Sequence, residues 1–360
     1  MEKPFRVLCI DGGGMRGLYS AVLLSTLAHR FDARFATNPP DLGKAFDLIC
    51  GTSTGAILAC GLAAGVSLSQ MESLYTDNGL QIFPNPSPTN EGLGIYAWAW
   101  KYRNGPAADA SKLKEILEKV FGSETIKQLY ERRKIAICIP AVDVSTYKAW
   151  VFKTPHNPGK HRDDNYTLAQ ACLASSAAPL LFPLACIDHP ERKEDKDFFA
   201  DGGLWANNPI LVGLIEALGL TAGKQPIDVL SVGTCDRPNG DPNAISNPNW
   251  GVKNWRAGMN IMEMAISSQS FGYTNAARFL GTQLTKLGAQ TRVLRLEQTN
   301  KSPEQYSAVN IDRADDVAIK TLKKMARMDA DAIHSKAIGS DPGDLGLLNE
   351  IFACLTALTK

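Results

Sequence analysis

An α/β fold, in which a mostly parallel sheet carries helices on both faces, is predicted by two features of the sequence. Short apolar runs alternate with helical patterns along most of the 360 residues, and this alternation is typical of strands joined by crossover helices. In addition, a strand, a glycine-rich turn and a helix follow one another twice near the N-terminus. Sheets built from such units bind their ligands at the carboxyl ends of the strands.

The first unit starts at residues 5–10, whose continuous apolar character predicts a strand buried on both faces. Three glycines follow, and then a helix whose apolar side carries Leu18, Val22, Leu23, Leu27 and Phe31. The second unit joins a strand at 45–50 to a helix of small residues at 56–64. Further strands are expected at 134–144, 149–153, 197–200, 227–232 and 291–296, and further helices near 111–121, 167–176, 209–218, 257–287, 313–337 and 344–358.

One segment, residues 78–106, departs from this alternation because it combines four prolines with interleaved aromatic and basic side chains. We interpret it as a long loop or lid, which either packs onto the body or contacts a membrane interface, where amphipathic rings are favoured. A second loop is expected at 236–249. No linker divides the chain, so we expect one domain over residues 1–360, with its core at about 4–235 and a helical C-terminal part at about 250–360.

The charge balance narrows the class of ligand. The chain has 38 Lys and Arg against 37 Asp and Glu, a formal net charge of +1. A nucleic acid polymer is therefore not expected as the main partner, because phosphate binding depends on clustered basic residues. A membrane partner stays open, since a protein can meet a bilayer through apolar surface. With 44% hydrophobic and 21% charged residues, the chain has the composition of a globular protein.

The N-terminal segment and the cysteines both predict a cytoplasmic protein. The apolar run at residues 7–10 is too short for a secretory signal, and the longest weakly polar stretch, 56–66, is well below the roughly 20 residues of a membrane span. The eight cysteines show no CxxC spacing, so we expect free thiols that behave as small hydrophobic groups, and we predict no metal site.

A candidate nucleophile lies in the second unit. The sequence Gly51-Thr52-Ser53-Thr54-Gly55 matches G-x-S-x-G between a predicted strand and a predicted helix, which is the context in which this motif acts as a nucleophile elbow. The small flanking residues allow a tight turn that lifts the Ser53 hydroxyl clear of the sheet. The alternative is a plain glycine-rich turn with an N-capping residue.

The glycines after the first strand belong to the sequence Asp11-Gly12-Gly13-Gly14-Met15-Arg16-Gly17. Successive glycine N–H groups can converge on an anion, so Gly12, Gly13 and Gly14, with Arg16, are candidates for an oxyanion hole. A phosphate cradle is the rival function, because the same residues satisfy G-x-G-x-x-G. Against the rival, no GxxxxGK[ST] occurs, and no acid ends the second strand to hold a ribose.

A candidate base lies 148 residues after Ser53, in the turn Asp201-Gly202-Gly203. A serine hydroxyl needs a group that accepts its proton as it attacks. Direct action of Asp201 on Ser53 is the simplest hypothesis, with burial raising the pKa of the carboxyl from about 3.9. An Asp-Gly-Gly surface turn is the alternative. Histidine is the usual base, but no strand-end glycine turn accompanies any of His29, His156, His161, His189 or His334.

Four ordered motifs, DGGGMRG (11–17), GTSTG (51–55), ASSAAP (174–179) and DGGLWANNP (201–209), make the chain resemble the patatin-like phospholipases over about residues 4–235. The resemblance implies a three-layer α/β/α sandwich and cleavage of acyl esters of lipids without a metal or other cofactor. It also implies that Ser53 is the nucleophile, that Asp201 is its partner in a dyad supported by Gly202 and Gly203, and that Gly12 to Gly14 with Arg16 form the oxyanion region.

A narrower resemblance, to bacterial patatin-like effectors of anti-phage defence, rests on the compact length and cytoplasmic character. It implies activation by a cyclic dinucleotide and action on the inner face of the cell membrane. Basic and aromatic side chains that pair phosphates and stack bases would be needed, and residues 250–256 and 278–295 contain candidates. Ordinary surface and core roles are the alternative for each of them.

The sequence therefore predicts a serine hydrolase of membrane phospholipids, and the narrower resemblance implies that a cyclic dinucleotide gates it. The residues at 261–287 form an amphipathic segment that either walls the acyl groove or packs as a core helix. Three other functions stay open: an ungated lipid hydrolase of general metabolism, a nucleotide-binding module using the Gly12 to Gly14 loop, and a catalytically silent lipid-binding scaffold. The oligomeric state, including a homo-oligomer, is also open.

Overall fold

A computed structural model describes residues 3–88, 93–192, 194–235, 249–252, 254–255, 258–299 and 301–358. Within these ranges, one sheet has the strand order β5-β6-β3-β2-β1-β7-β8, and β4 pairs with β3. The strands are β1 (Phe5–Ile10), β2 (Leu48–Gly51), β3 (Ala136–Asp143), β4 (Lys148–Lys153), β5 (Ala185–Asp188), β6 (Lys196–Asp201), β7 (Ile227–Val232) and β8 (Thr291–Arg295).

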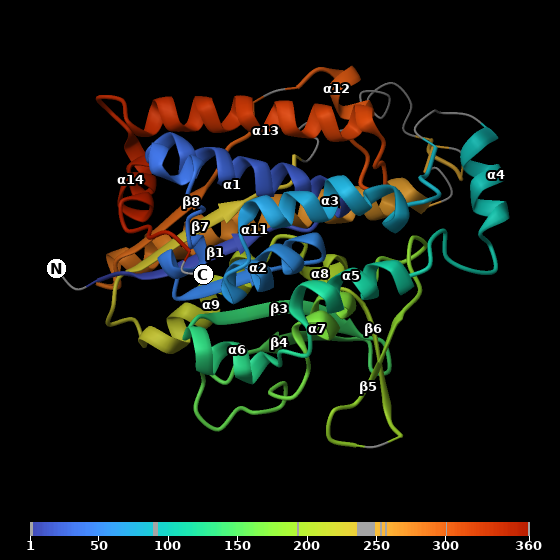
Figure 1. The fold of residues 1–360 in the computed structure, drawn as a ribbon, viewed down its shortest axis with the longest axis horizontal. Coiled ribbons are helices and arrows are strands. Elements are labelled where there is room, and N and C mark those ends of the chain that lie inside the picture. The colour runs from blue at the N-terminus through green and yellow to red at the C-terminus, as the bar shows by residue number, and fades with distance from the viewer. Residues whose placement is uncertain are drawn as a thin grey trace.

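The helices cover both faces of this sheet (Figure 1). They are α1 (Gly17–Phe31), α2 (Thr54–Ala64), α3 (Leu68–Ile82), α4 (Leu93–Lys101), α5 (Ser111–Phe121), α6 (Ile126–Arg133), α7 (Leu168–Ser175), α8 (Gly203–Ala206), α9 (Ile210–Thr221), α11 (Met259–Lys286), α12 (Pro303–Ser307), α13 (Asp316–Ala337) and α14 (Gly346–Phe352).

The sheet divides into a parallel part and an antiparallel part. Strands β3, β2, β1, β7 and β8 are parallel neighbours in that order. Both β4 and β6 run antiparallel to β3, and β5 runs antiparallel to β6. Parallel strands buried on both faces read as continuous apolar runs, which explains why β1 and β7 are found at the bounds that the sequence predicts.

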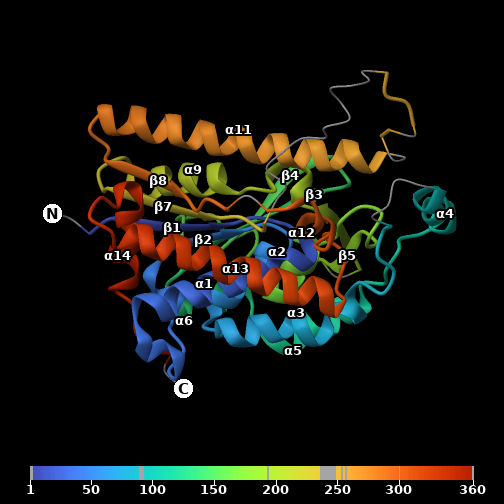
Figure 2. The ribbon, with the colours of Figure 1, turned by 90° about the horizontal axis from the view of Figure 1, so that it is seen from above.

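Successive side chains of the parallel strand β1 point to opposite faces of the sheet and pack into two separate cores. Val7 and Cys9 of β1 face one core, which contains Leu214 of α9 and Ala277 of α11. Leu8 and Ile10 face the larger core on the other side, to which α1, α2, α3, α5 and α13 contribute. Figure 2 shows α9 and α11 on one side of the strands, with α1, α3, α5 and α13 on the other. The predicted three-layer α/β/α sandwich is therefore confirmed.

Several elements were not expected from the sequence, among them α3, α6 and β5. Helices α3 and α6 both carry apolar residues at helical spacing, and each begins with a capping box, Ser67 with Gln70 and Thr125 with Gln128. An S/T-x-x-Q pattern before a helix is a readable start signal. Strand β5 has four residues and forms only through its pairing with β6, so its existence depends on a tertiary contact rather than on its own sequence.

The segment 78–106 is not a continuous loop, so this part of the prediction was wrong. Residues 78–82 complete α3, and residues 93–101 form α4. The four prolines of the segment all lie outside α4, where they cannot break it. The Trp98 indole N–H donates to the Asn85 carbonyl at 3.3 Å, whereas Trp100 is 70% exposed. The predicted loop at 236–249 lies outside the described residues except for Asn249.

The eight cysteines are free thiols, as expected, and six of them are buried, while Cys186 and Cys354 are exposed. In the described part of the chain, no helix combines the length and the hydropathy that crossing a bilayer requires.

Candidate active site

Three turns at strand ends meet at one place. Strands β1 and β2 are parallel neighbours with Ile10 opposite Gly51, so the glycine loop after β1 lies beside the turn after β2. Strand β6 approaches from the antiparallel part, where Asp201 pairs with Ala141 of β3. The topology therefore brings Ser53, Asp201 and the glycine loop together, as the sequence predicts.

The turn that carries Ser53 has a strained backbone. Ser53 has φ 55° and ψ −124°. Residues other than glycine rarely adopt this backbone conformation, which costs about 1–3 kcal/mol. A Cβ atom on Gly51 would lie 2.1 Å from the Gly55 carbonyl oxygen, so glycine is required there. The threonines brace the turn, because the Thr52 hydroxyl donates to Ala206 O at 2.5 Å and the Thr54 hydroxyl lies 2.5 Å from the Tyr75 hydroxyl.

The Ser53 hydroxyl donates a hydrogen bond to the Asp201 carboxylate, with 2.7 Å between Oγ and Oδ2. The other carboxylate oxygen accepts from the Gly203 N–H at 2.6 Å. Burial raises the pKa of Asp201 to about 6, although the hydrogen bonds from Gly203 and Ser53 act in the opposite direction. A carboxylate with this pKa is ionised at neutral pH and is a better proton acceptor than an exposed Asp.

The glycine loop offers two candidate donors rather than three. The Gly12 N–H is engaged, because it donates to Asn207 O at 2.9 Å. Among the described residues, no acceptor bonds the Gly13 or Gly14 N–H. Both glycines line the same groove as Ser53, and so does Arg16. Gly14 has φ +56°, and a Cβ there would lie 2.2 Å from Ile311 O.

The groove beside Ser53 is mainly apolar, as expected for a site that holds an acyl chain. Met262 and Ile266 of α11 contribute to its wall, so the amphipathic segment at 261–287 does border the groove. Other lining side chains come from α2, α3, α5, the 176–182 turn and α8: Ile57, Leu74, Tyr75, Ile82, Phe83, Leu113, Leu181, Phe182 and Leu204.

None of the described residues that line the groove is a histidine. His334 packs edge-on against the Phe31 ring with centroids 4.8 Å apart. His156 lies 3.1 Å from the Glu216 carboxylate and His161 lies 3.0 Å from the Asp164 carboxylate. His189 accepts from the backbone of its own turn. These contacts agree with a site that uses Asp201 without a histidine.

Two supporting residues were not singled out from the sequence. The Ser175 hydroxyl accepts from the Ser53 N–H at 2.8 Å and donates to Pro140 O at 2.6 Å. The Gly202 N–H donates to Ser175 O at 3.3 Å, so Ser175 holds both turns. The Asn207 side chain donates to Gly12 O at 3.3 Å. Both residues belong to quoted motifs, ASSAAP and DGGLWANNP, but their partners follow only from the fold.

One group of side chains away from the groove has metal-ligand chemistry. The ligand atoms of Cys138, His156 and Glu216 lie within 4.8 Å of one another, which the sequence spacing did not indicate. Lys153 pairs with the same carboxylate. Burial alone would raise the pKa of Glu216, but hydrogen bonds from His156 and Lys153 hold it at about 2. The lysine ammonium therefore already supplies the positive charge that a cation would bring.

The basic tracts suggested for an activator are partly committed elsewhere. Arg292 pairs with Asp228 and Glu350, and Arg295 pairs with Asp11. These two arginines are therefore engaged in ion pairs within the chain. Trp250 and Trp255 form an edge-to-face pair with centroids 4.9 Å apart, while Lys253 and Arg256 lie outside the described residues.

Comparison with known proteins identifies the family. A family model described as patatin-like phospholipase matches residues 8–214. A protein of Escherichia coli (strain TW11681) named cGAMP-activated phospholipase is 32% identical over 333 residues, which cover 89% of this chain and 88% of the relative. Proteins with the same name in Vibrio cholerae and Pseudomonas aeruginosa are 33% and 35% identical, over 74% of this chain and 75% and 72% of the relatives. This chain therefore belongs to the patatin-like phospholipase family.

Proposed function

We propose that this protein hydrolyses acyl esters of membrane phospholipids through Ser53 and Asp201. Asp201 accepts the Ser53 proton as Oγ attacks the ester carbonyl, and the tetrahedral intermediate then expels the lysolipid alcohol, which takes up that proton. Asp201 next accepts a proton from a water molecule that attacks the acyl-enzyme. Collapse of the second intermediate releases the fatty acid and returns the proton to Ser53.

The observation that carries this proposal is the 2.7 Å hydrogen bond between Ser53 Oγ and Asp201 Oδ2, placed in an apolar groove. The Gly13 and Gly14 N–H groups are the donors that we assign to the carbonyl oxygen as it gains negative charge. Such donors are worth about 10²–10³-fold in rate each in serine hydrolases. The dyad arrangement also agrees with the raised pKa of Asp201.

We also propose that a cyclic dinucleotide switches the enzyme on. The proposal draws on relatives from three bacteria, all named cGAMP-activated phospholipase. A membrane phospholipase without a switch would damage its own cell, so a gate is expected on physiological grounds. Action from the cytoplasm on the inner face of the membrane, in defence against phage, is the biological role that we assign to such a gated enzyme.

The test is release of fatty acid from vesicles of phosphatidylethanolamine and phosphatidylglycerol, with and without a panel of cyclic dinucleotides that includes cGAMP. We expect low basal release, strong stimulation by one or a few members of the panel, and no release by Ser53→Ala under any condition. High release of fatty acid in every condition would agree with the proposed hydrolase activity and would contradict activation by a cyclic dinucleotide. Release by Ser53→Ala at the wild-type rate would remove the proposed chemistry.

A further inference from the structure

A largely buried arginine lies behind the glycine loop, outside the segment that the family model matches. Arg295 is the last residue of β8, and its guanidinium binds the carboxylate of Asp11, the residue that precedes Gly12. We propose that Arg295 is a positioning residue for hydrolysis: through Asp11 it holds the glycine loop in the form that presents the Gly13 and Gly14 N–H groups to the reacting carbonyl. The proposal rests on the proposed function of Ser53 and the loop.

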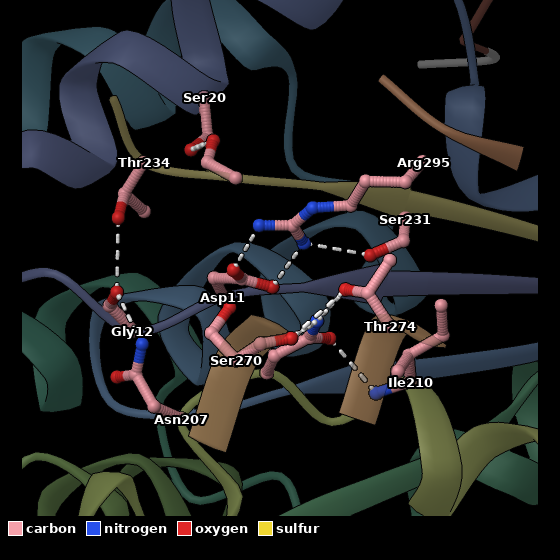
Figure 3. A network of polar contacts seen from close by, with 12 residues as sticks. Asp11, Gly12, Ser20, Asn207, Ile210, Ser231, Thr234, Ser270, Thr274 and Arg295 are labelled. Carbon is pink, nitrogen blue, oxygen red and sulfur yellow. Dashed lines mark hydrogen bonds and ion pairs between the residues drawn. The ribbon is translucent and has the colours of Figure 1, made fainter. Parts of the chain in front are cut away.

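The ion pair orients both side chains in addition to compensating the charge of Asp11. Arg295 Nη1 lies 2.7 Å from Asp11 Oδ1, and Nη2 lies 2.5 Å from Oδ2. Nη1 also donates to the Ser231 hydroxyl at 2.8 Å. Figure 3 shows the guanidinium facing Asp11 and Ser231 at the ends of β1 and β7. Two parallel N–H···O contacts restrict the rotation of both side chains, which a single contact would not do.

The Asp11 carboxylate is buried, so the conformation of the loop that follows it depends on the ion pair with Arg295. The Asp11 side chain is fully buried and that of Arg295 is 14% exposed. A buried carboxylate that loses a paired guanidinium is less well compensated, and a protein relieves such a loss by moving or by taking up a proton. The loop begins at the next residue, so a displaced Asp11 displaces Gly12 and the two glycines after it.

The first peptide of the loop is held by a second set of contacts, one of which comes from a segment that lies against the same arginine. The Gly12 carbonyl accepts from the Thr234 hydroxyl at 2.9 Å and from the Asn207 side chain at 3.3 Å. Thr234 follows Gly233, and a Cβ atom added to Gly233 would lie 2.9 Å from Arg295 Nη2. The guanidinium therefore packs against the backbone that presents Thr234. Figure 3 shows Thr234 and Asn207 converging on Gly12.

Arg295 acts through these neighbours and not on the substrate. It is not among the residues that line the groove, whereas Gly13, Gly14 and Ser53 are. Neutralising Asp11 has a second effect, because a bare carboxylate next to the loop would oppose the negative charge that develops on the substrate oxygen. Both effects lower the barrier of the chemical step and leave contacts with the lipid tail unchanged. Loss of Arg295 should therefore lower kcat and leave KM almost unchanged.

A matched control exists on the same strand. Arg292 binds the buried Asp228 with a comparable fork, 2.7 Å from Nε to Oδ1 and 2.8 Å from Nη2 to Oδ2. It lies toward the opposite end of β8, in register with Asp228 of β7, and its ion-pair partners Asp228 and Glu350 are not among the described residues that line the groove. Loss of Arg292 should affect folding alone.

The experiment compares Arg295→Met, Arg295→Lys and Arg292→Met, with p-nitrophenyl butyrate as substrate and the activating cyclic dinucleotide present. We expect Arg295→Met to lower kcat by about 100-fold with KM within about twofold, Arg295→Lys to lie between it and the wild type, and Arg292→Met to keep the wild-type kcat. The double variant Asp11→Asn/Arg295→Met removes both buried charges. It should recover thermal stability while kcat stays low.

Hydrogen exchange of the peptide that contains residues 10–16 gives a readout that does not need activity. Exchange should be faster in Arg295→Met and unchanged in Arg292→Met. A wild-type kcat in Arg295→Met, or recovery of kcat together with stability in the double variant, would overturn the positioning role. If the wild type itself hydrolyses no ester, the proposed function fails, and unchanged exchange in Arg295→Met would then reject the positioning role separately.

Discussion

Two turns of this protein have the same three residues, Asp-Gly-Gly, and differ in what surrounds the aspartate. Asp11 follows the last residue of β1, Asp201 is the last residue of β6, and both are buried. Asp11 faces the guanidinium of Arg295. Asp201 faces the Ser53 hydroxyl and the Gly203 N–H, and within the described ranges no Lys, Arg or His pairs with it. The comparison teaches that the partner, not the local sequence, decides what a buried aspartate can do.

The physical reason lies in the cost of a buried charge. A carboxylate matched by a cation is stabilised as an ion and has little tendency to bind a proton. A carboxylate matched only by neutral donors is held less firmly as an ion, and burial raises the pKa of Asp201 to about 6. Asp11 is therefore suited to hold a loop, whereas Asp201 is suited to exchange a proton with Ser53 during a reaction.

The largest expected difference between the two turns is in activity. Asp201→Asn removes the proton acceptor, so we expect kcat to fall by about 10³–10⁴-fold, within the range that general bases contribute. Asp11→Asn leaves the acceptor in place and disturbs only the loop, so the expected fall is about 10–100-fold. Hydrolysis of p-nitrophenyl butyrate by purified variants measures both. Equal losses in the two variants would mean that the aspartates are not functionally distinct.

Stability should change in opposite directions. Asp11→Asn removes the carboxylate that faces the largely buried Arg295 guanidinium, which destabilises the fold by about 3–5 kcal/mol. Asp201 has a folded pKa of about 6, above the value of about 3.9 for an unfolded chain. Keeping it ionised therefore costs folding free energy at neutral pH, and Asp201→Asn should stabilise the protein by about 1–2 kcal/mol. Urea unfolding at pH 7.5 compares the variants with the wild type.

The sign of the pH dependence follows from the same pKa. Because the folded pKa of Asp201 lies above the unfolded value, its contribution to stability falls as the pH rises from about 4 to about 6. The advantage of Asp201→Asn in thermal midpoint should therefore be larger at pH 7.5 than at pH 5. A gap of the same size at both pH values would show that Asp201 does not titrate in this range.

The smallest effect expected is in the pH profile of the reaction itself. The base must be ionised, so kcat/KM should fall about tenfold per pH unit below pH 6, with a dependence on one proton, and should be flat above that value. His334→Ala should keep this profile and the wild-type rate, because its ring packs on Phe31 away from the groove. A midpoint near 7 that disappears in a histidine variant would assign the base to that histidine.

The sequence predicts which residues meet at this place where they stand in local motifs, and it does not predict contacts between residues that are distant along the chain. Short motifs contain Ser53, Asp201 and the glycine loop, and the residue types in these motifs already indicate a nucleophile, a base and an anion-binding loop. Their approach follows from strand ends meeting at one edge of the sheet. By contrast, Asp11 and Arg295 are 284 positions apart, and nothing in either local sequence selects the other as a partner.

The same distinction explains the gaps in the predicted fold. Strands β1 and β7 are buried on both faces and appear in the sequence as apolar runs. Strand β5 exists through its pairing with β6, and its neighbours cannot be read from four residues. Helix α4 has few polar residues to define a face, so the sequence does not separate it from the proline-containing segment around it. Gly12 was expected among the oxyanion donors, and its engagement by Asn207 follows only from the folded loop.

The most direct test of the central claim is to map the site of a fluorophosphonate adduct by mass spectrometry in the activated protein. We predict one adduct, on Ser53, in the wild type and in His334→Ala. Its formation in Asp201→Asn should be slower by about 10³-fold, since the hydroxyl then lacks its proton acceptor. An adduct on another residue, or labelling of Asp201→Asn at the wild-type rate, would contradict a Ser53–Asp201 dyad.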